Sequence, residues 1–398
     1  MDAEEARTIG WALWRVRHER GKSLRVVAGL ASMSKDTLSR IERGELSPTL
    51  NQIHALADAL QISASELTRL PVPAPANGHT DSTAVAVQVA LDGIESGEPG
   101  GIVLPVAVLR EQVRDLHRQR RACRFAEVAT ELPGLVRNLH TTLDTGTDHG
   151  ELLELAVYLH VHVTRLWLTH SAAPADLVRR TVFLARRLAQ ERDEISTLGM
   201  AGFGVVDNLL GSGLVELSRS RLDSITVLPV TADTAGLVCN LTMLHAHAAV
   251  LDGRPEDAVA PMDAAAELAG RFGATGEADA LGFVHAQADV ALHRMSVALE
   301  VGDPDQVVHI ARDTAPESHP FRVGQAQIWR THGQALARVR GRHDDAVRAL
   351  RTAESIFPAV VLRDPFVRDT LAVLLRRSRR DAVGQELQGM ARRAGVPL

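Results

Sequence analysis

The sequence has 398 residues, 45% of them hydrophobic, and a formal net charge of −5 at pH 7. This length allows two or three domains with a large core, and the charge excludes a protein that binds nucleic acid by general basicity alone. The acidic start, MDAEEART, is unlike a secretory signal, and Cys123 and Cys239 match no metal or redox spacing. We therefore expect a cytoplasmic protein with reduced thiols.

Residues 23–48, with the sequence SLRVVAGLASMSKDTLSRIERGELSP, predict two short helices joined by a tight turn. Ser23 and Ser34 are suited to cap the two helices, and Gly44 is suited to end the second. The turn itself is expected at residues 31–33. A short second helix with polar side chains on its first two turns meets the requirement for reading the DNA major groove, because such side chains can reach the base edges.

These residues resemble the Cro/repressor-type, or Xre-like, helix-turn-helix family over about residues 9–70, with SKDTLSRIERGELSP as the core of the match. A preceding helix carries a helical apolar stripe, and a following helix ends in the family-like ALQIS. One position departs from the family pattern, because Ser32 stands where the turn commonly has glycine. Serine can adopt the left-handed conformation at modest cost, so the match stands.

The resemblance implies a set of DNA contacts. Base contacts are expected from Lys35, Asp36 and Arg40. Contacts to the DNA backbone are expected from Ser34, Arg43 and Ser47. The family often has a buried ion pair that ties the first helix to the third, and its positions are occupied here by Arg17 and Glu42. That pair would be structural.

Other interpretations of this region stay open. Two short amphipathic helices joined by a turn also occur in helical bundles that never contact DNA. Some helix-turn-helix domains serve mainly for dimerisation or for binding a partner protein. Asp36 is mildly unfavourable near phosphate, although a carboxylate can accept a hydrogen bond from cytosine N4.

A boundary follows at residues 71–82, PVPAPANGHTDS, which are Pro-rich and then polar without an apolar period. Within the next segment, AVAVQVAL is predicted as a helix rather than a strand, and residues 95–101 as a loop. The sequence therefore predicts a helix-turn-helix domain at residues 1–70, a Pro-rich linker and connecting segment at 71–104, and a helical domain at 105–398.

The helical region carries a weak internal repeat. Its clearest unit has the tetratricopeptide spacing, at Gly341, Ala346, Leu350, Ala353 and Pro358. Weaker units lie at Gly253, Ala258, Met262 and Ala265, and at Gly302, Val307, Ala311 and Thr314. Because one helix pair cannot bury its apolar side alone, several pairs must stack and leave a concave surface. We therefore predict an all-α protein, with a helix-turn-helix bundle followed by a tetratricopeptide-like α-solenoid. The alternative is an Ala-rich helical domain used only for dimerisation.

The whole arrangement is similar to a broad group of actinobacterial regulators that join this N-terminal domain to a tetratricopeptide-like C-terminal region. The similarity is carried by DVALHRMSVALEVGD (289–303), GRHDDAVRALRTAESI (341–356) and ELQGMARRAGV near the end of the chain. The two-part layout also resembles peptide-sensing regulators of Gram-positive bacteria, in which the concave face of the solenoid holds the signal.

In this register, the first helix of each unit lines the concave face. Six polar residues are then expected on one surface: Asn240, His247, Asp289, Ser296, Thr331 and Arg338. Such a row could bind a peptide backbone or a polar small molecule. The alternative is that these residues occupy ordinary solvated helix positions.

Other candidate sites lack the spacing that their chemistry requires. His160 and His162, like His245 and His247, are two residues apart and would point to different faces of a helix, whereas a helical metal pair needs a spacing of four. No P-loop, catalytic-serine or dinucleotide motif occurs, so we expect no metal, no cofactor and no enzyme activity. Residues 114–124, RDLHRQRRACR, either extend the DNA contact or form a solvated helix face.

The sequence thus predicts a sequence-specific transcriptional regulator that binds double-stranded DNA. Three base contacts of about 1–3 kcal/mol each give one domain modest discrimination, so we expect a homodimer on a palindromic operator. The C-terminal domain would bind a peptide or small-molecule effector or mediate assembly. No membrane contact is expected, because the longest uncharged run, residues 234–251, is predicted as a buried helix. The alternative function is an interaction scaffold, in which the solenoid binds a protein and the N-terminal domain serves pairing.

Overall fold

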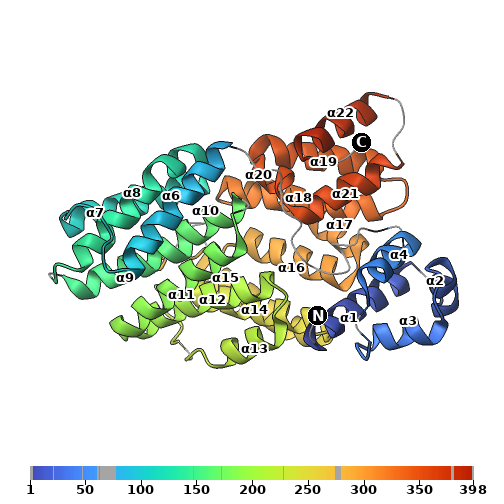
Figure 1. Cartoon of the computed structure of the whole chain (residues 1–398), viewed down its shortest axis with the longest axis horizontal. Coiled ribbons are helices and arrows are strands. Elements are labelled where there is room, and N and C mark those ends of the chain that lie inside the picture. The colour runs from blue at the N-terminus through green and yellow to red at the C-terminus, as the bar shows by residue number, and fades with distance from the viewer. Residues whose placement is uncertain are drawn as a thin grey trace.

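The computed structural model describes residues 3–20, 22–46, 48–60, 62, 78–146, 148–171, 173–226, 228–273, 279–377 and 381–396. All regular elements in these ranges are helical, which confirms the predicted all-α class (Figure 1). Among the described helices, none combines the length and the apolar character that crossing a membrane requires. The predicted buried helix over residues 234–251 is present as α14 (Ala235–Leu251), and most of its apolar side chains are buried.

The N-terminal domain is a small bundle of four described helices. They are α1 (Ala3–Glu19), α2 (Leu24–Leu30), α3 (Lys35–Glu42) and α4 (Leu50–Leu60). One apolar side chain from each helix reaches full burial at its centre: Leu13, Val27, Leu38 and Leu56. Because these residues recur at helical spacing, the packing that the sequence predicted for this domain is present.

The predicted caps and turn of this domain are confirmed. The Ser23 hydroxyl accepts the Val26 amide at 3.3 Å, and the Ser34 hydroxyl accepts the Thr37 amide at 3.0 Å. Ser32 has a φ of +54°, so it does adopt the left-handed conformation at the turn. The hydroxyl caps satisfy amides that otherwise lack a partner at a helix start, and they hold α3 at a defined entry angle.

The predicted boundary at residue 104 lies too late in the chain. Helix α6 (Gly78–Glu95) confirms the helix predicted from AVAVQVAL, but it packs on α8 (Phe125–Leu143) rather than bridging two domains. Val87, Ala90 and Leu91 belong to the same apolar cluster as α8. Helix α6 is therefore part of the C-terminal domain, and residues 71–77 lie outside the described residues.

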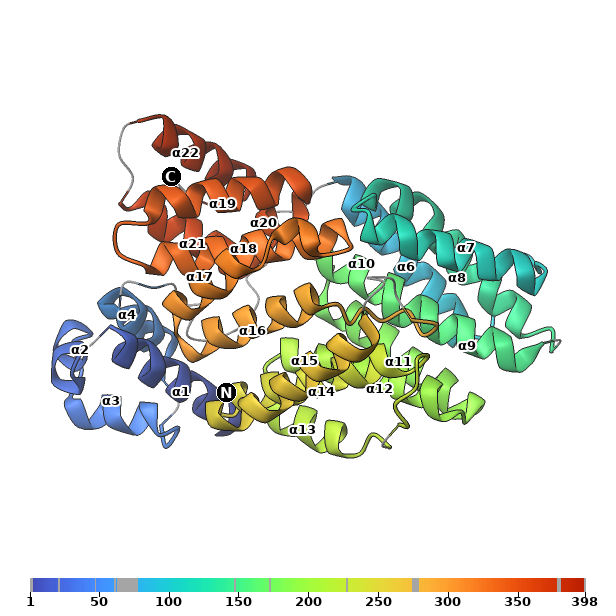
Figure 2. The same ribbon diagram turned by 180° about the vertical axis from the view of Figure 1, so that it is seen from behind.

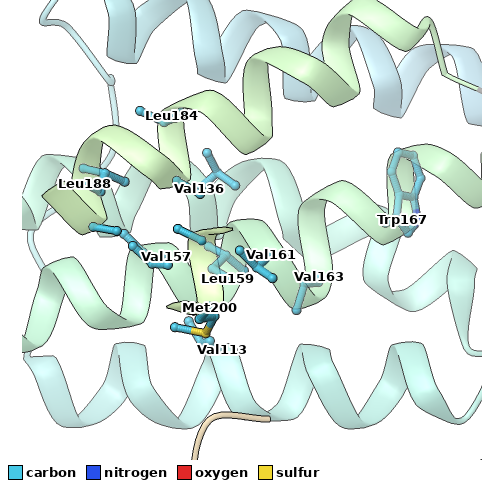
Figure 3. Packing of buried hydrophobic residues seen from close by; sticks show 14 of the residues in the cluster. Val113, Val136, Val157, Leu159, Val161, Val163, Trp167, Leu184, Leu188 and Met200 are labelled. Carbon is cyan, nitrogen blue, oxygen red and sulfur yellow. The ribbon is translucent and has the colours of Figure 1, made fainter. Parts of the chain in front are cut away.

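The first half of the C-terminal domain packs around one large core. Its further helices are α7 (Val106–Arg121), α9 (His149–Leu159), the π-helix η1 (His160–Thr164), α10 (Arg165–His170), α11 (Ala175–Arg192), α12 (Ile195–Gly211) and α13 (Val215–Asp223). Figure 3 shows Val113, Val157 and Met200 of this core, from α7, α9 and α12. Trp167, on α10, is the largest of its fully buried side chains and is 2% exposed.

Three helical hairpins follow at the positions of the predicted repeat units. They are α14 with η2 (Pro255–Ala258) and α15 (Val259–Phe272), α16 (Gln287–Val301) with α17 (Pro304–Asp313), and α18 (Arg322–Arg338) with α19 (His343–Ile356). Gly253, Gly302 and Gly341 lie at the three turns with φ of +79°, +89° and +78°, a conformation that glycine adopts without strain. Helices α14, α16 and α18 contact one another in succession, so the hairpins stack as a solenoid-like array.

The two halves of the C-terminal domain also meet each other. The chain ends in α20 (Ala359–Leu362), α21 (Pro365–Leu375) and α22 (Ala382–Arg393), which pack with α18 and α19. Phe125, at the start of α8, packs against Phe357 with the ring centroids 4.6 Å apart, and Arg363 donates to the His170 carbonyl at 3.4 Å. These contacts close the array, so segments far apart in the sequence enclose common cavities.

Candidate nucleic-acid interface

The outer face of α3 carries the three predicted base-reading residues. Lys35, Asp36 and Arg40 are all exposed. Figures 1 and 2 both show α3 at an outer edge of the molecule, away from the helices of the C-terminal domain. The neighbouring Ser34 is exposed as well, although its hydroxyl already serves as the helix cap. The face that would enter a major groove is therefore open to solvent.

Arg43 is less available than the sequence implied. Its guanidinium donates to both carboxylate oxygens of Glu45, at 2.7 and 2.8 Å, and to the Ser39 hydroxyl at 2.6 Å. These hydrogen bonds raise the pKa of Arg43 and lower the pKa of Glu45. A DNA phosphate would have to replace Glu45 as the partner of Arg43. Ser47, the third predicted backbone contact, lies outside the described residues.

Arg17 and Glu42 form the ion pair that the resemblance implied. The Arg17 guanidinium donates two parallel hydrogen bonds to the Glu42 carboxylate, at 2.6 and 2.8 Å, and a third to the Lys22 carbonyl at 3.1 Å. The two side chains are only 8% and 6% exposed. This bidentate geometry joins α1 to the end of α3 and fixes the angle of the recognition helix.

Two further residues that hold the helices of this domain together were not singled out in the sequence. A Cβ atom on Gly10 would lie 2.3 Å from the Ile41 carbonyl oxygen and 2.8 Å from that of Glu42, so glycine is what allows α1 to approach the last turn of α3. Lys22, between α1 and α2, donates a hydrogen bond from its ammonium group to the Ala59 carbonyl of α4 at 2.9 Å. Neither close approach leaves a periodic signal in the sequence.

Helix α1 also docks the N-terminal domain onto the C-terminal domain. Trp11 packs against the apolar cluster of α14, α15 and α16, and its indole nitrogen lies beside the turn at Gly253. Arg15, one helical turn later, is 5% exposed and donates to the backbone carbonyl and to the carboxylate of Glu300 at the end of α16. The same helix therefore contacts both the recognition helix and the helical array.

The six predicted effector residues do not form one open row. The Asn240 amide donates to the Gly236 and Val284 carbonyls, at 2.8 and 2.7 Å, so the segment before α16 lies against it. His247 is hydrogen-bonded to His293 at 2.9 Å, and burial lowers its pKa to about 4. Both side chains are engaged in packing the array.

The remaining four residues are spread over separate places. Asp289 lies 3.5 Å from the ring of His319, Ser296 bonds back to its own helix, and Thr331 is 1% exposed. Arg338 is exposed and lines a cavity of about 890 Å³ between the two domains. Because neighbouring segments cover the faces of α14 and α16 that the register turns inward, the predicted surface is not open. A role of these residues in effector binding stays a prediction.

His160 and His162 have separate structural partners. The rings of His140 and His160 are hydrogen-bonded through their Nε2 atoms at 2.9 Å, and His162 is bonded to the Leu281 carbonyl at 2.8 Å. Burial holds the pKa of His160 and of His162 well below the usual value, so both rings are neutral. In the described part of the chain, no three metal-ligating side chains come together.

The basic segment at residues 114–124 fits neither of its two interpretations. It lies mostly on α7, which Figures 1 and 2 place on the opposite side of the molecule from α3, so it does not extend the recognition surface. His117 and Arg120 are 3% and 5% exposed, so the segment is not a plain solvated face either. Arg114 and Arg118 are exposed. The helix has a buried basic side that the sequence did not reveal.

Comparison with known proteins agrees with this geometry. Residues 8–70 match the family model described as a helix-turn-helix domain, and this match covers most of α1 and all of α2, α3 and α4. No curated protein and no solved structure matches the chain significantly. The match and the exposed second helix of the motif lead to the same conclusion: the N-terminal part of this chain is a helix-turn-helix DNA-binding domain.

Proposed function

We propose that this protein is a sequence-specific transcriptional regulator of the cytoplasm that binds a palindromic operator as a homodimer. The exposed Lys35, Asp36 and Arg40 on a rigidly held α3 carry this proposal. Each good base contact discriminates by about 1–3 kcal/mol, so a single domain selects only weakly. Two domains on half-sites about 34 Å apart would reach the specificity that a genome requires.

Replacing Arg40 with alanine is expected to remove sequence preference more than total affinity. Because Arg40 is exposed on α3 and has room to reach a base, its loss should lower the preference for the operator by about 1–3 kcal/mol, or roughly 5- to 150-fold. The measurement is sequencing of the genomic fragments that the purified protein retains at near-physiological salt, with wild type and Arg40→Ala side by side.

A short palindromic motif in the wild-type fragments that is lost from the Arg40→Ala fragments would support the regulator. If Arg40→Ala weakens all DNA equally, the arginine contacts a phosphate and the assigned register is wrong. Arg25→Ala is a suitable control, because this exposed arginine lies on α2 rather than on the recognition helix. Its loss should leave the motif unchanged.

The scaffold alternative has one observation in its favour. Val26 and Leu30 lie one turn apart on α2 and are 50% and 59% exposed, which gives the domain an apolar surface for pairing with another protein. A scaffold would retain no specific DNA motif. The same fragment sequencing therefore separates the two functions, since enrichment of a palindrome is expected for the regulator alone.

We further propose that the C-terminal domain binds a small-molecule or peptide effector, or mediates assembly. The contact of α1 with the C-terminal domain through Trp11 and Arg15, called the α1 joint below, would transmit the state of that domain to α3. The joint supports this because α1 contacts α3 on one side and α14 to α16 on the other. Coupling through such a joint is typically about 1–3 kcal/mol, a 5- to 150-fold change in operator affinity.

A pair of glycine substitutions tests the joint. Gly253 and Gly341 occupy equivalent hairpin turns at nearly the same φ, so alanine should strain both backbones equally, by about 1–2 kcal/mol. At Gly253 the new Cβ would also lie 2.8 Å from the Trp11 indole nitrogen, whereas at Gly341 it would meet nothing within 4 Å. We expect Gly253→Ala, and not Gly341→Ala, to release the N-terminal domain and to enlarge the radius of gyration in small-angle X-ray scattering.

Equal expansion in the two variants would show that strain in the array is responsible, and the joint would then have no special role. An unchanged radius in both variants would also contradict the proposed docking through Trp11. Operator affinity, measured on the same samples, should change in Gly253→Ala and stay at the wild-type value in Gly341→Ala.

A further inference from the structure

A cavity of about 670 Å³ lies where the two halves of the C-terminal domain meet. Its walls come from α7, from Tyr158 at the end of α9, from residues 279–280 and from residues 320–322 at the start of α18. Figure 2 shows the segment before α16 extending alongside α9. Leu281 of this segment is hydrogen-bonded to His162 in η1, which directly follows α9. The cavity has the volume of a small-molecule site.

Four arginines line this cavity, against one carboxylate. The arginines are Arg114, Arg118, Arg121 and Arg322. Asp115 forms an ion pair with Arg118 at 2.9 Å, whereas no ion pair joins Arg114 or Arg322 to a described residue. The carboxylate belongs to Asp279, which accepts the Phe283 amide at 2.8 Å and whose pKa burial raises to about 6. The lining therefore carries a clear excess of positive charge.

Arg121 is held rigidly at the wall. Its guanidinium donates to the Gly282 carbonyl, and its central carbon lies 4.2 Å from the centre of the Phe321 ring. Burial lowers the pKa of Arg121 to about 10, so the side chain remains charged at neutral pH. A charged group fixed in this way needs little rearrangement to receive an anion, which favours binding.

A second buried arginine, Arg120, does not line the cavity but interacts electrostatically with Arg121 and Tyr158, which do. Arg120 is 5% exposed, its Nε atom has no hydrogen-bond partner, and it forms no ion pair with a described residue. Burial lowers its pKa to about 9, which still leaves the guanidinium charged at pH 7. A buried charge without a counter-charge is unfavourable, and an anion bound in the adjacent cavity would compensate it.

His117 contributes a further polar atom to the lining of the cavity. His117 is 3% exposed and is bonded through Nδ1 to the Tyr158 hydroxyl at 2.5 Å, whereas its Nε2 atom has no partner in the structure. Burial and the neighbouring arginines hold the pKa of His117 well below its usual value, so the ring is neutral. Its ring stacks on His162 within the π-helix, a type of segment that is frequent at functional sites.

We propose that this cavity binds a small organic anion, a molecule that carries a carboxylate or phosphate beside an apolar or aromatic part. Arg114, Arg121 and Arg322 would bind the anionic group, while Tyr158 and Phe321 would contact the apolar part. We further identify this anion with the effector of the regulator, and only that identification rests on the function proposed above. Anion binding by the cavity is a property of the C-terminal domain alone.

The probe for this site is 1-anilinonaphthalene-8-sulfonate, with the neutral N-phenyl-1-naphthylamine as its partner, since the two share a ring system and differ by the sulfonate. The full chain should bind the sulfonate probe at one site, and at least about tenfold more tightly than the neutral probe, as expected for one charge-assisted hydrogen bond or more. Inorganic phosphate should compete for the site. The thermal midpoint should rise with the probe, which shows binding to the folded chain.

The double variant Arg114→Ala/Arg322→Ala should lose about tenfold or more in affinity for the sulfonate probe and little for the neutral probe. Both arginines are exposed, so the fold should be retained. The matched control is Arg312→Ala/Arg392→Ala, which removes the same charge from exposed arginines outside the cavity. An unchanged affinity in the first variant, or an equal loss for both probes, would overturn the proposal.

The experiments distinguish failure of the anion-site proposal from failure of the proposed regulatory function. The probe measurements contain no DNA, and the retained-fragment experiment contains no probe. Sulfonate binding that is lost in Arg114→Ala/Arg322→Ala supports the anion site even if no DNA motif is enriched. If a DNA motif is enriched but the cavity shows no preference for the anionic probe, the proposed regulator is supported and the proposed anion site is contradicted.

Discussion

Replacing Glu42 with alanine is expected to destabilise the N-terminal domain by about 3–5 kcal/mol, because Arg17 would remain buried without its counter-charge. The Arg17 side chain is 8% exposed, so solvent cannot replace the lost carboxylate. Hydrogen exchange of the α3 amides in the full chain measures the local free energy of unfolding. Operator affinity should fall with it, because α3 would no longer be held at a fixed angle.

The matched control is Glu45→Ala in the same domain. Glu45 also forms a bidentate pair, with Arg43, but both side chains are about half exposed, and pairs of this kind contribute little. Protection of the α3 amides should therefore stay near the wild-type level. Similar losses in Glu42→Ala and Glu45→Ala would show that burial of the Arg17 pair does not determine the stability of the domain.

Gly10→Ala is expected to displace the recognition helix, which would lower the stability of the domain by about 1–3 kcal/mol. The added Cβ would lie 2.3 Å from the Ile41 carbonyl oxygen, and a backbone atom can move away only if α3 moves as a whole. We expect faster exchange of the α3 amides and a loss of specific DNA retention.

Gly29→Ala is the comparison variant, and its expected effect on the stability of the domain has the opposite sign. A Cβ on Gly29 meets nothing within 4 Å, and the residue lies in α2, where alanine is the better helix former by about 1 kcal/mol. This variant should be at least as stable as the wild type and should bind the same DNA. A loss of stability in both variants would contradict the close approach between α1 and α3.

The N-terminal domain could be predicted from the sequence because short-range interactions define it. Ser23 and Ser34 are followed within three residues by the amides they cap, and the apolar stripe of each helix is visible as spacing. The resemblance placed Arg17 opposite Glu42, 25 residues away, and the structure joins them. The family match over residues 8–70 rests on the same local pattern.

The hairpin turns of the C-terminal domain could also be predicted in this way. Each predicted repeat unit began with a glycine, and Gly253, Gly302 and Gly341 all have positive φ. Helices commonly end in that conformation, and glycine adopts it without strain, so a glycine after a helical pattern predicts such a turn. The stacking order of the hairpins followed from their order in the chain.

The candidate effector surface could not be predicted from the same pattern. The register of a repeat fixes which face of a helix points inward, but not which distant segment covers that face. Val284 lies against Asn240, and His319 lies beside Asp289. Likewise, α6 was assigned to a linker because its burial depends on α8, about forty residues later in the chain.

The sequence by itself determined the helical class, the caps and turns, the helix-turn-helix motif and its buried ion pair, since each depends on neighbouring residues or on a recurrent motif. Only the tertiary structure decided that Trp11 and Arg15 dock the two domains, that α6 joins the large core, and that Arg120 lies buried without a counter-charge beside a basic cavity. These features depend on contacts between segments far apart in the sequence, from about forty residues for α6 and α8 to 285 for Arg15 and Glu300. No local periodicity records such a contact.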